Sequence, residues 1–367
     1  MRRQRTPYRF LFAGGGTGGH LFPAVAVAEK IKMMIPEAEI LFIGTKSKIE
    51  GAIVPQLGFK FQSIWIKGFS RKINLENLLF PLKLFISIIQ SILINVKFKP
   101  KVAIGSGGYV SGPAIIGSSL TGAKIILLEQ NSYPGITTKL LEKYAQEVHI
   151  SFEDSKKYFR NIKKLLLTGN PIRTGLALTK KDDALNEFGL LPFNKTLLVI
   201  GGSLGAASMN EAVAESIKKF NEKGIQLIWQ TGNGYFDKYK NLASDFVKIL
   251  PFISKMNLAY SACDLLLARA GATTIAELLA LGIPSILVPS PNVAENHQYF
   301  NAESLANNNA AILLEDKNMK SELADKIIFT IMNEEKIKQL RQNALALAKP
   351  DAAEIIAGNA IKYAQGI

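Results

Sequence analysis

Cysteine and histidine are scarce in this 367-residue chain, and their scarcity excludes several kinds of chemistry. Its single cysteine, Cys263, cannot form an internal disulfide, which fits a reducing compartment. Its three histidines, His20, His149 and His297, show no metal-ligand spacing, and no Asp-x-Asp pair ends a predicted strand. The chain has no Walker sequence, because its first glycine cluster lacks the lysine of a P-loop. We therefore expect neither a bound metal nor a cofactor.

The sequence also lacks long apolar runs and has fewer acidic than basic residues. No window reaches the roughly twenty uninterrupted apolar residues that span a membrane, and the longest candidate, residues 78–96, contains a proline, a lysine and two amides. The apolar run 10–13 is too short for a signal peptide. We therefore expect a cytoplasmic chain that does not cross the membrane. With 44 Lys and Arg against 30 Asp and Glu, the net charge is +14, which favours acidic partners such as nucleic acid, anionic lipid or phosphorylated metabolites.

Glycine is plentiful, and much of it is gathered in four turns. Each turn follows a short apolar segment and precedes a helical pattern; the turns are 14–20, 105–113, 201–207 and 269–277. Glycine lets the backbone approach a ligand closely, and a helix N-terminus presents N–H groups and a positive dipole end to an anion. We interpret the turns as anion-binding sites, and for the turn 14–20 a glycine-rich turn that binds nothing is the structural alternative.

The length suits two α/β domains, and the pattern of elements divides in the same way. Short buried strands alternate with helices from residue 10 onward, and the alternation restarts after the turn 169–173. We predict an N-terminal domain over 1–168 and a C-terminal domain over 169–349, with a last helix in 350–367 packing back on the first. The predicted class is α/β, with two Rossmann-like, doubly wound parallel sheets that bind ligands beyond the carboxyl ends of their strands.

Residues 67–101 differ in composition from the rest of the first half. Apolar side chains surround most of a predicted helix here and basic residues flank it; the apolar ones are Leu75, Leu78, Leu79, Leu82, Phe85, Ile86, Ile89, Ile92, Leu93 and Val96, and the basic ones Lys67, Arg71, Lys72, Lys83, Lys97, Lys99 and Lys101. A buried core helix with solvated basic ends is one interpretation. The other, which the positive net charge favours, is a surface whose apolar side enters the membrane interface while lysines meet anionic headgroups.

Several polar residues end predicted strands or begin helices. The polar segment 129–131 lies at the carboxyl end of a predicted strand, where a ligand could bind. The alternative is that Asn131 caps the next helix. Glu277 suits a ribose diol, or else it is a favourable partner of the helix dipole. The proline-rich turn 289–298 can carry its last two residues to a ligand, with a solvated helix start as the alternative. His149 lies in an apolar run, and we expect it to be a core histidine.

Six short motifs occur in a characteristic order. They are GGGTGGH at 14–20, GSGGYVSGP at 105–113, EQN at 129–131, GNPIR at 169–173, GGSLGA at 201–206 and GATTIAE at 271–277. As a set they resemble the MurG family of bacterial glycosyltransferases, which transfer N-acetylglucosamine from UDP-N-acetylglucosamine to lipid I and so form lipid II for peptidoglycan. The resemblance implies a GT-B fold, in which two Rossmann-like domains face a cleft. It also implies an inverting, metal-independent transfer to the C4 hydroxyl of the muramyl sugar.

The same resemblance assigns roles to individual residues. Arg173 and Ser203 would contact the donor diphosphate, Glu277 the ribose, and Gln298 the sugar. The full set implied for the donor is Thr17, Gly18, Gly19, Asn131, Arg173, Ser203, Ile253, Ala272, Thr273, Thr274, Ile275, Ala276, Glu277 and Gln298. The set implied for the acceptor is Gly15, Gly16, His20, Ser106, Gly107, Gly108, Tyr109 and Ser111. Leu204 and His297 depart from the family, which has glutamine at both positions.

The partners implied are UDP-N-acetylglucosamine and lipid I, with no nucleic acid. The basic, apolar region 67–101 matches the part of the family that touches an anionic phospholipid surface. The expected location is therefore peripheral, at the cytoplasmic face of the bacterial plasma membrane.

A general base should accept the proton of the attacking hydroxyl. His20 is the first candidate, because it closes a glycine turn and an imidazole exchanges its proton near neutral pH. Glu129 is the second, and a His20 that only orients the turn or donates to the acceptor pyrophosphate is the alternative.

Three different functions compete with this interpretation. A dinucleotide oxidoreductase would need an acidic residue about twenty positions past the glycines, where this chain has Gly44-Thr45-Lys46. A non-catalytic anion-binding scaffold at the membrane would need neither Glu277 nor Gln298. A GT-B glycosyltransferase that uses another nucleotide or a soluble acceptor is the most serious competitor, because it would share the fold and the glycine turns.

Overall fold

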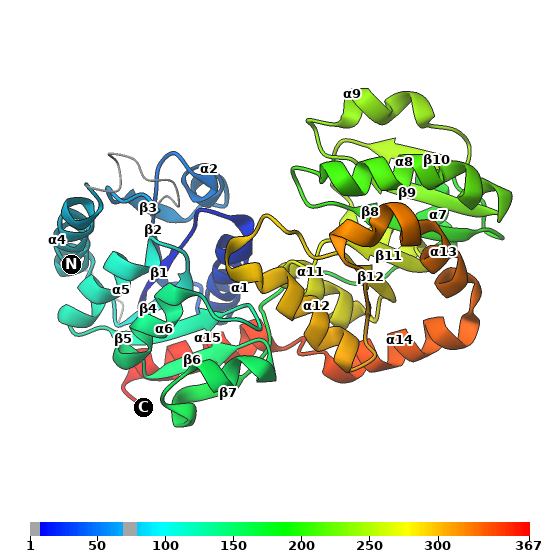
Figure 1. Ribbon diagram of the computed structural model, residues 1–367. Helices are drawn as coiled ribbons and strands as arrows, with labels where there is room; N and C mark the ends of the chain where they lie inside the picture. Colours follow the sequence, from blue (N-terminus) through cyan, green and yellow to red (C-terminus); the bar gives the residue numbers. More distant parts are fainter. Residues whose placement is uncertain (1–7, 69–78) are drawn as a thin grey trace. The chain divides into compact units, whose positions relative to one another are not determined.

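The computed structural model describes residues 8–68 and 79–367, which form two compact α/β units. The first unit consists of Met1–Thr174 and Lys349–Ile367, and the second of Gly175–Ala348 (Figure 1). Each unit has its own parallel sheet and its own buried core. The two parallel-sheet domains predicted from the sequence are therefore confirmed.

The chain leaves the first unit later than the sequence predicted, after residue 174 and not at residue 168. The turn in between is bonded into the first unit: the Gly169 N–H donates to the Ile150 carbonyl (3.2 Å), and the Thr174 hydroxyl donates to the Glu29 carboxylate (3.4 Å). The motif at 169–173 therefore belongs to the first unit, although the sequence placed it at the start of the second.

Among the described residues, the first unit is built on a seven-stranded parallel sheet of order β3-β2-β1-β4-β5-β6-β7. Its strands are β1 (Arg9–Gly14), β2 (Glu39–Gly44), β3 (Lys60–Ser63), β4 (Val102–Gly107), β5 (Lys124–Glu129), β6 (Glu147–Ile150) and β7 (Leu165–Leu167). Residues 10–13 of β1 and 102–104 of β4 are 0% exposed. The central strands are apolar along their length because helices cover both faces of a parallel sheet.

The helices of the first unit form a layer on each face of its sheet. They are α1 (Gly18–Met34), α2 (Ile49–Gln56), α4 (Phe80–Phe98), α5 (Ser111–Leu120), α6 (Ile136–Leu141) and α15 (Ala352–Gln365). Apolar residues of α1 and α15 share one core with alternate residues of β1, and those of α5 share the other. The C-terminal helix α15 contributes Ile356, Ala357 and Ala360, all 0% exposed, to the core that it shares with α1 (Figure 1).

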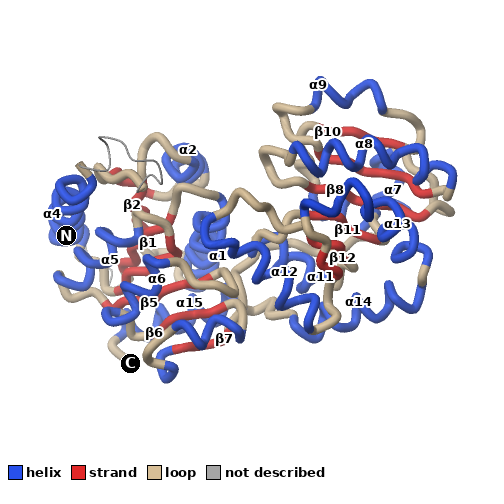
Figure 2. The backbone as a smooth tube through the Cα atoms, viewed as in Figure 1, coloured by secondary structure: helices blue, strands red, loops and turns tan. Residues whose placement is uncertain are grey.

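The second unit has a parallel sheet of order β10-β9-β8-β11-β12-β13. Figure 2 shows the strands of the two units in red. Its strands are β8 (Lys195–Ile200), β9 (Ile225–Gln230), β10 (Val247–Leu250), β11 (Leu265–Ala268), β12 (Ser285–Leu287) and β13 (Ile312–Leu313). Its helices are α7 (Lys181–Phe188), α8 (Ala207–Glu222), α9 (Phe236–Tyr239), α10 (Met256–Ala262), α11 (Ala272–Leu281), α12 (His297–Asn307), α13 (Met319–Met332) and α14 (Glu334–Leu347). Its core is built around Trp229 and Phe220, which are both 0% exposed.

In each sheet the strand order reverses next to the first strand of the unit, between β1 and β4 and between β8 and β11. At such a switch point the chain leaves neighbouring strands in opposite directions, which opens a crevice at the carboxyl edge where ligands bind. The glycine turns predicted from the sequence follow β1, β4, β8 and β11. All four turns thus lie at the two switch points.

The predicted apolar helix of residues 67–101 forms as α4, with its polar side turned inward. Ser87, Ser91 and Asn95, spaced by four residues, are at most 1% exposed, and the Ser118 hydroxyl of α5 donates to Asn95 Oδ1 (3.0 Å). The outward side carries large apolar residues that are 41–64% exposed, namely Leu82, Phe85, Ile89, Leu93 and Val96. The structure therefore contradicts a fully buried core helix and supports an apolar surface.

By length and composition alone, α4 is apolar enough to cross a membrane, contrary to our expectation from its interruptions. Its serine and asparagine face packs on α5, however, so one side of α4 is bound to the first unit. Of the residues that led to its prediction, Arg71, Lys72, Leu75 and Leu78 lie outside the part of the chain that the structure describes.

Candidate functional site

In the first unit, the turns after β1 and β4 touch each other. Gly107 and Gly108 have φ angles of +95° and +78°, and a Cβ atom on Gly108 would lie 2.6 Å from the Gly15 carbonyl oxygen. Glycine alone permits both this conformation and this approach without strain. The two turns bring together the predicted residues Gly15, Gly16, Thr17, Gly18, Gly19, His20, Ser106, Gly107, Gly108, Tyr109 and Ser111.

The four helices that follow the glycine turns begin without acidic or capping side chains. None of α1, α5, α8 and α11 has a side-chain cap hydrogen bond, and none has an acidic residue in its first turn. By contrast, α13, α14 and α15 each carry glutamate in the first turn. The positive ends of the four helices are thus not neutralised by carboxylates of their own first turns, which suits a negatively charged ligand.

His20 lies in the first turn of α1, and its ring is held by the neighbouring strand ends. Its Nδ1 lies 2.9 Å from the Ser106 carbonyl oxygen and 3.2 Å from Gln130 Oε1. Gln130 is oriented by a hydrogen bond from its Nε2 to the same Ser106 carbonyl (3.0 Å). Because both neighbours of Nδ1 are acceptors, we assign the proton of the neutral ring to Nδ1 and the lone pair to Nε2.

Ser106 and Ser111, two of the predicted acceptor residues, use their side chains inside the protein. They are 0% and 1% exposed. The Ser106 hydroxyl donates to the His20 carbonyl (2.7 Å), and the Ser111 hydroxyl accepts from the Gly107 N–H (3.1 Å). We therefore give these hydroxyls a structural role, holding the two turns in register, in place of the ligand contact expected from the sequence.

Glu50, in the first turn of α2, supports the first glycine turn from behind. Its carboxylate is 1% exposed and accepts hydrogen bonds from the N–H groups of Gly16 (2.9 Å) and Thr45 (3.0 Å). A buried carboxylate needs such partners to offset its desolvation. Sequence reasoning missed Glu50, because its only local signal was a helix start shortly after a strand, and the contact to Gly16 depends on the fold.

Glu129, the last residue of β5, holds the turn that follows it. Its carboxylate is 2% exposed and accepts from the N–H groups of Asn131 and Gly135, at 3.0 Å each. Burial raises the pKa of Glu129 to about 7, although hydrogen bonds from Asn131, Thr138 and Gly135 act in the opposite direction. The alternative in which Asn131 caps the next helix is wrong, since α6 has no side-chain cap.

In the second unit, Gln230 at the end of β9 joins two predicted donor segments. Its Nε2 donates to the Gly202 carbonyl (3.0 Å), and its Oε1 accepts from the Ile253 N–H (2.8 Å). Ser203 lies at the exposed tip of the same glycine turn. Leu204, which stands where the resemblance predicts glutamine, is 84% exposed. The turn is therefore fixed at its base by Gln230 and carries an apolar side chain at its tip.

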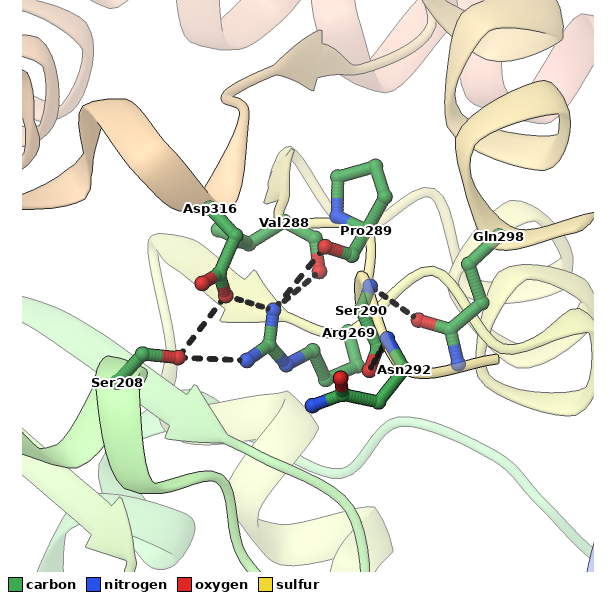
Figure 3. A network of polar contacts seen from close by, with 8 residues as sticks. All are labelled: Ser208, Arg269, Val288, Pro289, Ser290, Asn292, Gln298 and Asp316. Atoms are coloured by element: carbon green, nitrogen blue, oxygen red, sulfur yellow. Dashed lines mark hydrogen bonds and ion pairs between the residues drawn. The ribbon is translucent and has the colours of Figure 1, made fainter. Parts of the chain in front are cut away.

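Arg269, at the end of β11, is the centre of a network that sequence reasoning did not predict (Figure 3). Its Nη1 donates to Asp316 Oδ1 and to the Pro289 carbonyl (3.1 Å), and its Nη2 donates to the Ser208 hydroxyl (3.0 Å). The Ser208 hydroxyl also donates to Asp316 Oδ1 (2.9 Å). The network joins the first turn of α8 to the chain after β12 and thus fixes the second switch point.

The N-terminal half of α11 carries the predicted residues Ala272, Thr273, Thr274, Ile275, Ala276 and Glu277. Thr273 Oγ1 is buried and has no hydrogen-bond partner within residues 8–68 and 79–367. Such a hydroxyl is costly unless it is paired, so its place at a helix start suits a ligand oxygen. Glu277 is 3% exposed and accepts from the Tyr260 hydroxyl (2.9 Å), which fixes the direction of its carboxylate.

The start of α12 carries His297 and Gln298. Gln298 Oε1 accepts from the Ser290 N–H (2.9 Å) and so holds the proline-rich turn after β12 (Figure 3). His297 Nδ1 lies 2.8 Å from the Ala294 carbonyl oxygen. Both residues are partly exposed, so a solvated helix start remains the alternative to a ligand contact.

The predicted site residues divide between the two units. The first unit holds the turns at 14–20 and 105–113, Glu129 and Asn131, and it also holds Arg173, which the sequence had placed in the second domain. The second unit holds Ser203, Ile253, residues 272–277 and Gln298. His149 is a core histidine as expected, 1% exposed with Glu147 and Thr168 beside its ring. Among the described residues, no group of three His, Cys, Asp or Glu side chains is suited to a metal.

Two parallel-sheet units, each with two glycine turns at its switch point, have the architecture of GT-B glycosyltransferases. Comparison with known proteins agrees. The glycosyltransferase family 28 N-terminal domain matches residues 10–150, and the glycosyltransferase family 28 C-terminal domain matches residues 196–356. The crystal structure of MurG from Acinetobacter baumannii is 25% identical and has a TM-score of 0.79, covering 97% of this chain and 100% of that one.

Curated relatives that share one transferase name identify the family within this class. A UDP-N-acetylglucosamine–N-acetylmuramyl-(pentapeptide) pyrophosphoryl-undecaprenol N-acetylglucosamine transferase of Flavobacterium psychrophilum is 42% identical over 363 residues, which is 98% of each chain. A relative of the same name from Cytophaga hutchinsonii is 41% identical over 355 residues, or 96% of each chain. The chain belongs to the MurG family within glycosyltransferase family 28.

Proposed function

We propose that this chain is a metal-independent, inverting glycosyltransferase that moves N-acetylglucosamine from UDP-N-acetylglucosamine to the C4 hydroxyl of the muramyl sugar of lipid I. The product is lipid II, a precursor of peptidoglycan. The names of the full-length relatives support these substrates. The observation that carries the proposal in this chain is His20, whose Nδ1 faces two carbonyl oxygens while its Nε2 carries the lone pair, beside two glycine turns built for an anion.

The reaction is a displacement at the anomeric carbon of the donor sugar. The muramyl C4 oxygen forms a bond to this carbon, the bond to the UDP oxygen breaks with its electron pair going to the diphosphate, and the configuration inverts. The hydroxyl proton passes to a general base. Helix N-termini and the side chains of Arg173 and Ser203 would stabilise the negative charge that develops on the leaving diphosphate.

His20 is the proposed base, and general base catalysis typically contributes about 10²–10⁴-fold. We give Glu129 a positioning role, because its carboxylate already accepts from the N–H groups of Asn131 and Gly135. This arrangement would orient Asn131 toward the transferred sugar, together with the turn of Thr17, Gly18 and Gly19. The acceptor pyrophosphate would lie on the glycine turns after β1 and β4.

In the second unit, α11 is the proposed site for the nucleotide. Glu277, oriented by Tyr260, would accept from the ribose hydroxyls. Thr273 Oγ1 would meet a phosphate oxygen at the helix start, and Ile253 would lie against the uracil. Gln298 would contact the sugar through its Nε2, which makes no hydrogen bond to any residue that the structure describes, while its Oε1 holds the Ser290 turn.

We further propose that the protein is peripheral at the cytoplasmic face of the plasma membrane, with α4 as its contact. The exposed apolar side of this helix would enter the interface, and Lys97 would meet anionic phospholipid. An apolar helix face of this size is otherwise unfavourable in water. This location would bring the first unit to the lipid-borne acceptor.

Calorimetric titration tests the donor assignment. We expect UDP-N-acetylglucosamine to bind more tightly than UDP-glucose, and NADH to show no saturable binding. Tighter binding of NADH would indicate a dinucleotide oxidoreductase and contradict the proposal. Transfer from UDP-N-acetylglucosamine to a lipid I analogue, followed by mass spectrometry of the product, tests the whole reaction.

Flotation with anionic vesicles tests the membrane contact. We expect the double variant Phe85→Ser/Leu93→Ser to lose about tenfold or more in vesicle affinity, because two exposed apolar side chains no longer enter the interface. The matched control is Leu191→Ser/Phe193→Ser, which removes exposed apolar side chains from the second unit (52% and 97% exposed). Equal loss in both variants, or in neither, would contradict a specific contact by α4.

A further inference from the structure

A basic cavity of about 470 Å³ lies at the carboxyl edge of the first sheet, outside the residues assigned so far to the donor. Its volume falls within the range of small-ligand sites. The loop between β2 and α2, the chain after β3, the helix α4 and the turn after β4 all contribute to its wall. The side chains that define its chemistry are Lys46, Lys48, Lys67, Lys83, Trp65 and Tyr109.

The charge of this cavity is of one sign. Of the residues that the structure describes, four lysines line it and no Asp or Glu does. The lysine ammonium is a point charge on a flexible side chain, so it can pair with anionic groups in several positions. Arginine would impose a planar, bidentate geometry instead. The cavity therefore suits a flexible ligand that carries negative charges.

The cavity also has an aromatic wall. The backbone N–H of Trp65 donates to Gln90 Oε1 (2.7 Å), and Lys83 Nζ lies 5.6 Å from the centre of the Trp65 ring. Trp65 is nevertheless about half exposed. A ligand with apolar groups next to its charges would gain from this surface, as an aliphatic peptide does and inorganic phosphate does not.

Tyr109 separates the cavity from the first glycine turn. The Thr45 hydroxyl donates to the Tyr109 hydroxyl (3.5 Å) on the cavity side. On the other side, the ring lies against the backbone of Gly16, where an added Cβ atom would be 3.2 Å from Tyr109 Cε1. Tyr109 therefore lies between the first glycine turn and the cavity.

We propose that this cavity binds the stem peptide of the acceptor through its carboxylate groups. The inference rests on the proposed function, since the acceptor named for the relatives carries a pentapeptide on its muramyl sugar. Muramic acid has a carboxyl group, so a peptide attached to it as an amide is joined through its amino end and finishes in a free carboxylate. An anionic lipid headgroup is favoured less, because Lys46 and Lys48 belong to the loop before α2 and not to the apolar face of α4.

The experiment compares two acceptors, a muramyl-pentapeptide pyrophosphate with a free terminal carboxylate and the same molecule with a terminal amide. Both carry a short, soluble lipid chain, so that no membrane is needed. For the unmodified enzyme we expect KM to be about 5- to 10-fold lower for the acid, the effect of two or three solvated ion pairs. For Lys46→Gln/Lys48→Gln we expect KM for the acid to rise to the value for the amide.

The matched control is Lys124→Gln/Lys163→Gln, which removes the same charge at exposed positions of the first unit. We expect it to keep the preference for the acid. Equal KM values for acid and amide in the unmodified enzyme would overturn the inference while leaving the proposed transfer intact. A rise in KM for both acceptors in Lys46→Gln/Lys48→Gln would also overturn the inference. The same holds if this variant changes KM only when phosphatidylglycerol vesicles are present. Absence of transfer to either acceptor would contradict the proposed function itself.

Discussion

At the level of single residues, the chemistry of His20 depends on which ring nitrogen carries the proton. Ser106 and Gln130 present two carbonyl oxygens to Nδ1, so the lone pair lies on Nε2. A substitution that keeps a donor near the position of Nδ1 but has no atom at Nε2 therefore separates the orienting role of His20 from its proposed catalytic role.

We predict that His20→Asn and His20→Ala both lower kcat by about 10²-fold or more, the usual contribution of a general base. The asparagine amide can still donate to the Ser106 carbonyl from near the position of Nδ1, but it has no atom at Nε2. Steady-state kinetics gives kcat, and calorimetry should show unchanged binding of UDP-N-acetylglucosamine in both variants. Near-normal turnover of His20→Asn would leave His20 with an orienting role only.

Glu129 gives a second prediction, which concerns pH. Its pKa in the folded chain is about 7, above the ordinary value of 4.5, because burial disfavours the ionised form. The folded state therefore holds a proton that the unfolded state has lost between about pH 4.5 and about pH 7. The associated stability is present below this range and is lost as the pH rises through it, by on the order of 3 kcal/mol.

Urea unfolding at several pH values measures this effect. In Glu129→Gln, which cannot titrate, we expect the free energy of unfolding to depend less on pH between 5 and 8 than in the unmodified protein. Parallel pH profiles for the two proteins would show that Glu129 is ionised throughout and that its pKa is not raised.

At the level of elements, α4 is the helix whose orientation matters most. Its small polar residues lie against α5, and a Cβ atom on Gly117 of α5 would be 2.7 Å from the Ser91 Cβ atom. The close packing of these two helices thus depends on having no side chain at Gly117. This packing is what leaves the apolar side of α4 exposed.

We predict that Gly117→Ala lowers the free energy of unfolding by about 1–3 kcal/mol, the cost of overpacking. Gly112→Ala is the matched control in the same helix, because a Cβ atom there would have no neighbour within 4 Å. Its alanine should leave stability equal or raise it by up to about 1 kcal/mol through helix propensity. Chemical denaturation of both variants provides the comparison, and equal stability of the two would mean that α4 can move away without cost.

At the level of the whole molecule, the described chain has four helices without acidic residues in their first turns, and in the proposed function these N-termini and Arg173 would meet the charge of a diphosphate. We predict that treatment with EDTA changes the rate of transfer by less than about twofold, because in the proposed mechanism these groups would stabilise the leaving group without a metal. A loss of activity that Mg²⁺ restores would contradict this mechanism. The assay should use enzyme freed of metal before the acceptor is added.

Much of the fold was predictable from the sequence because its signals are local. Strands such as β1 and β8 appear as short apolar runs, and the glycine turns mark where each run ends. The predicted boundary between the units was less accurate, six residues before the observed one (168 against 174). The motif at 169–173 reads as a turn in any context, and the contacts of Gly169 and Thr174 that hold it to the first unit involve residues far away in the chain.

The sequence by itself determined the two α/β units, the positions of the four glycine turns and the membership of the MurG family, because hydrophobic periodicity and glycine spacing are local properties of the chain. Only the tertiary structure decided what supports the site: Gln130 beside His20, Glu50 behind Gly16, and Asp316 with Arg269. It also decided that α4 turns its serines inward and its apolar side outward. These features pair residues that are distant in sequence, and such pairs are fixed by packing and by the need to satisfy buried polar groups.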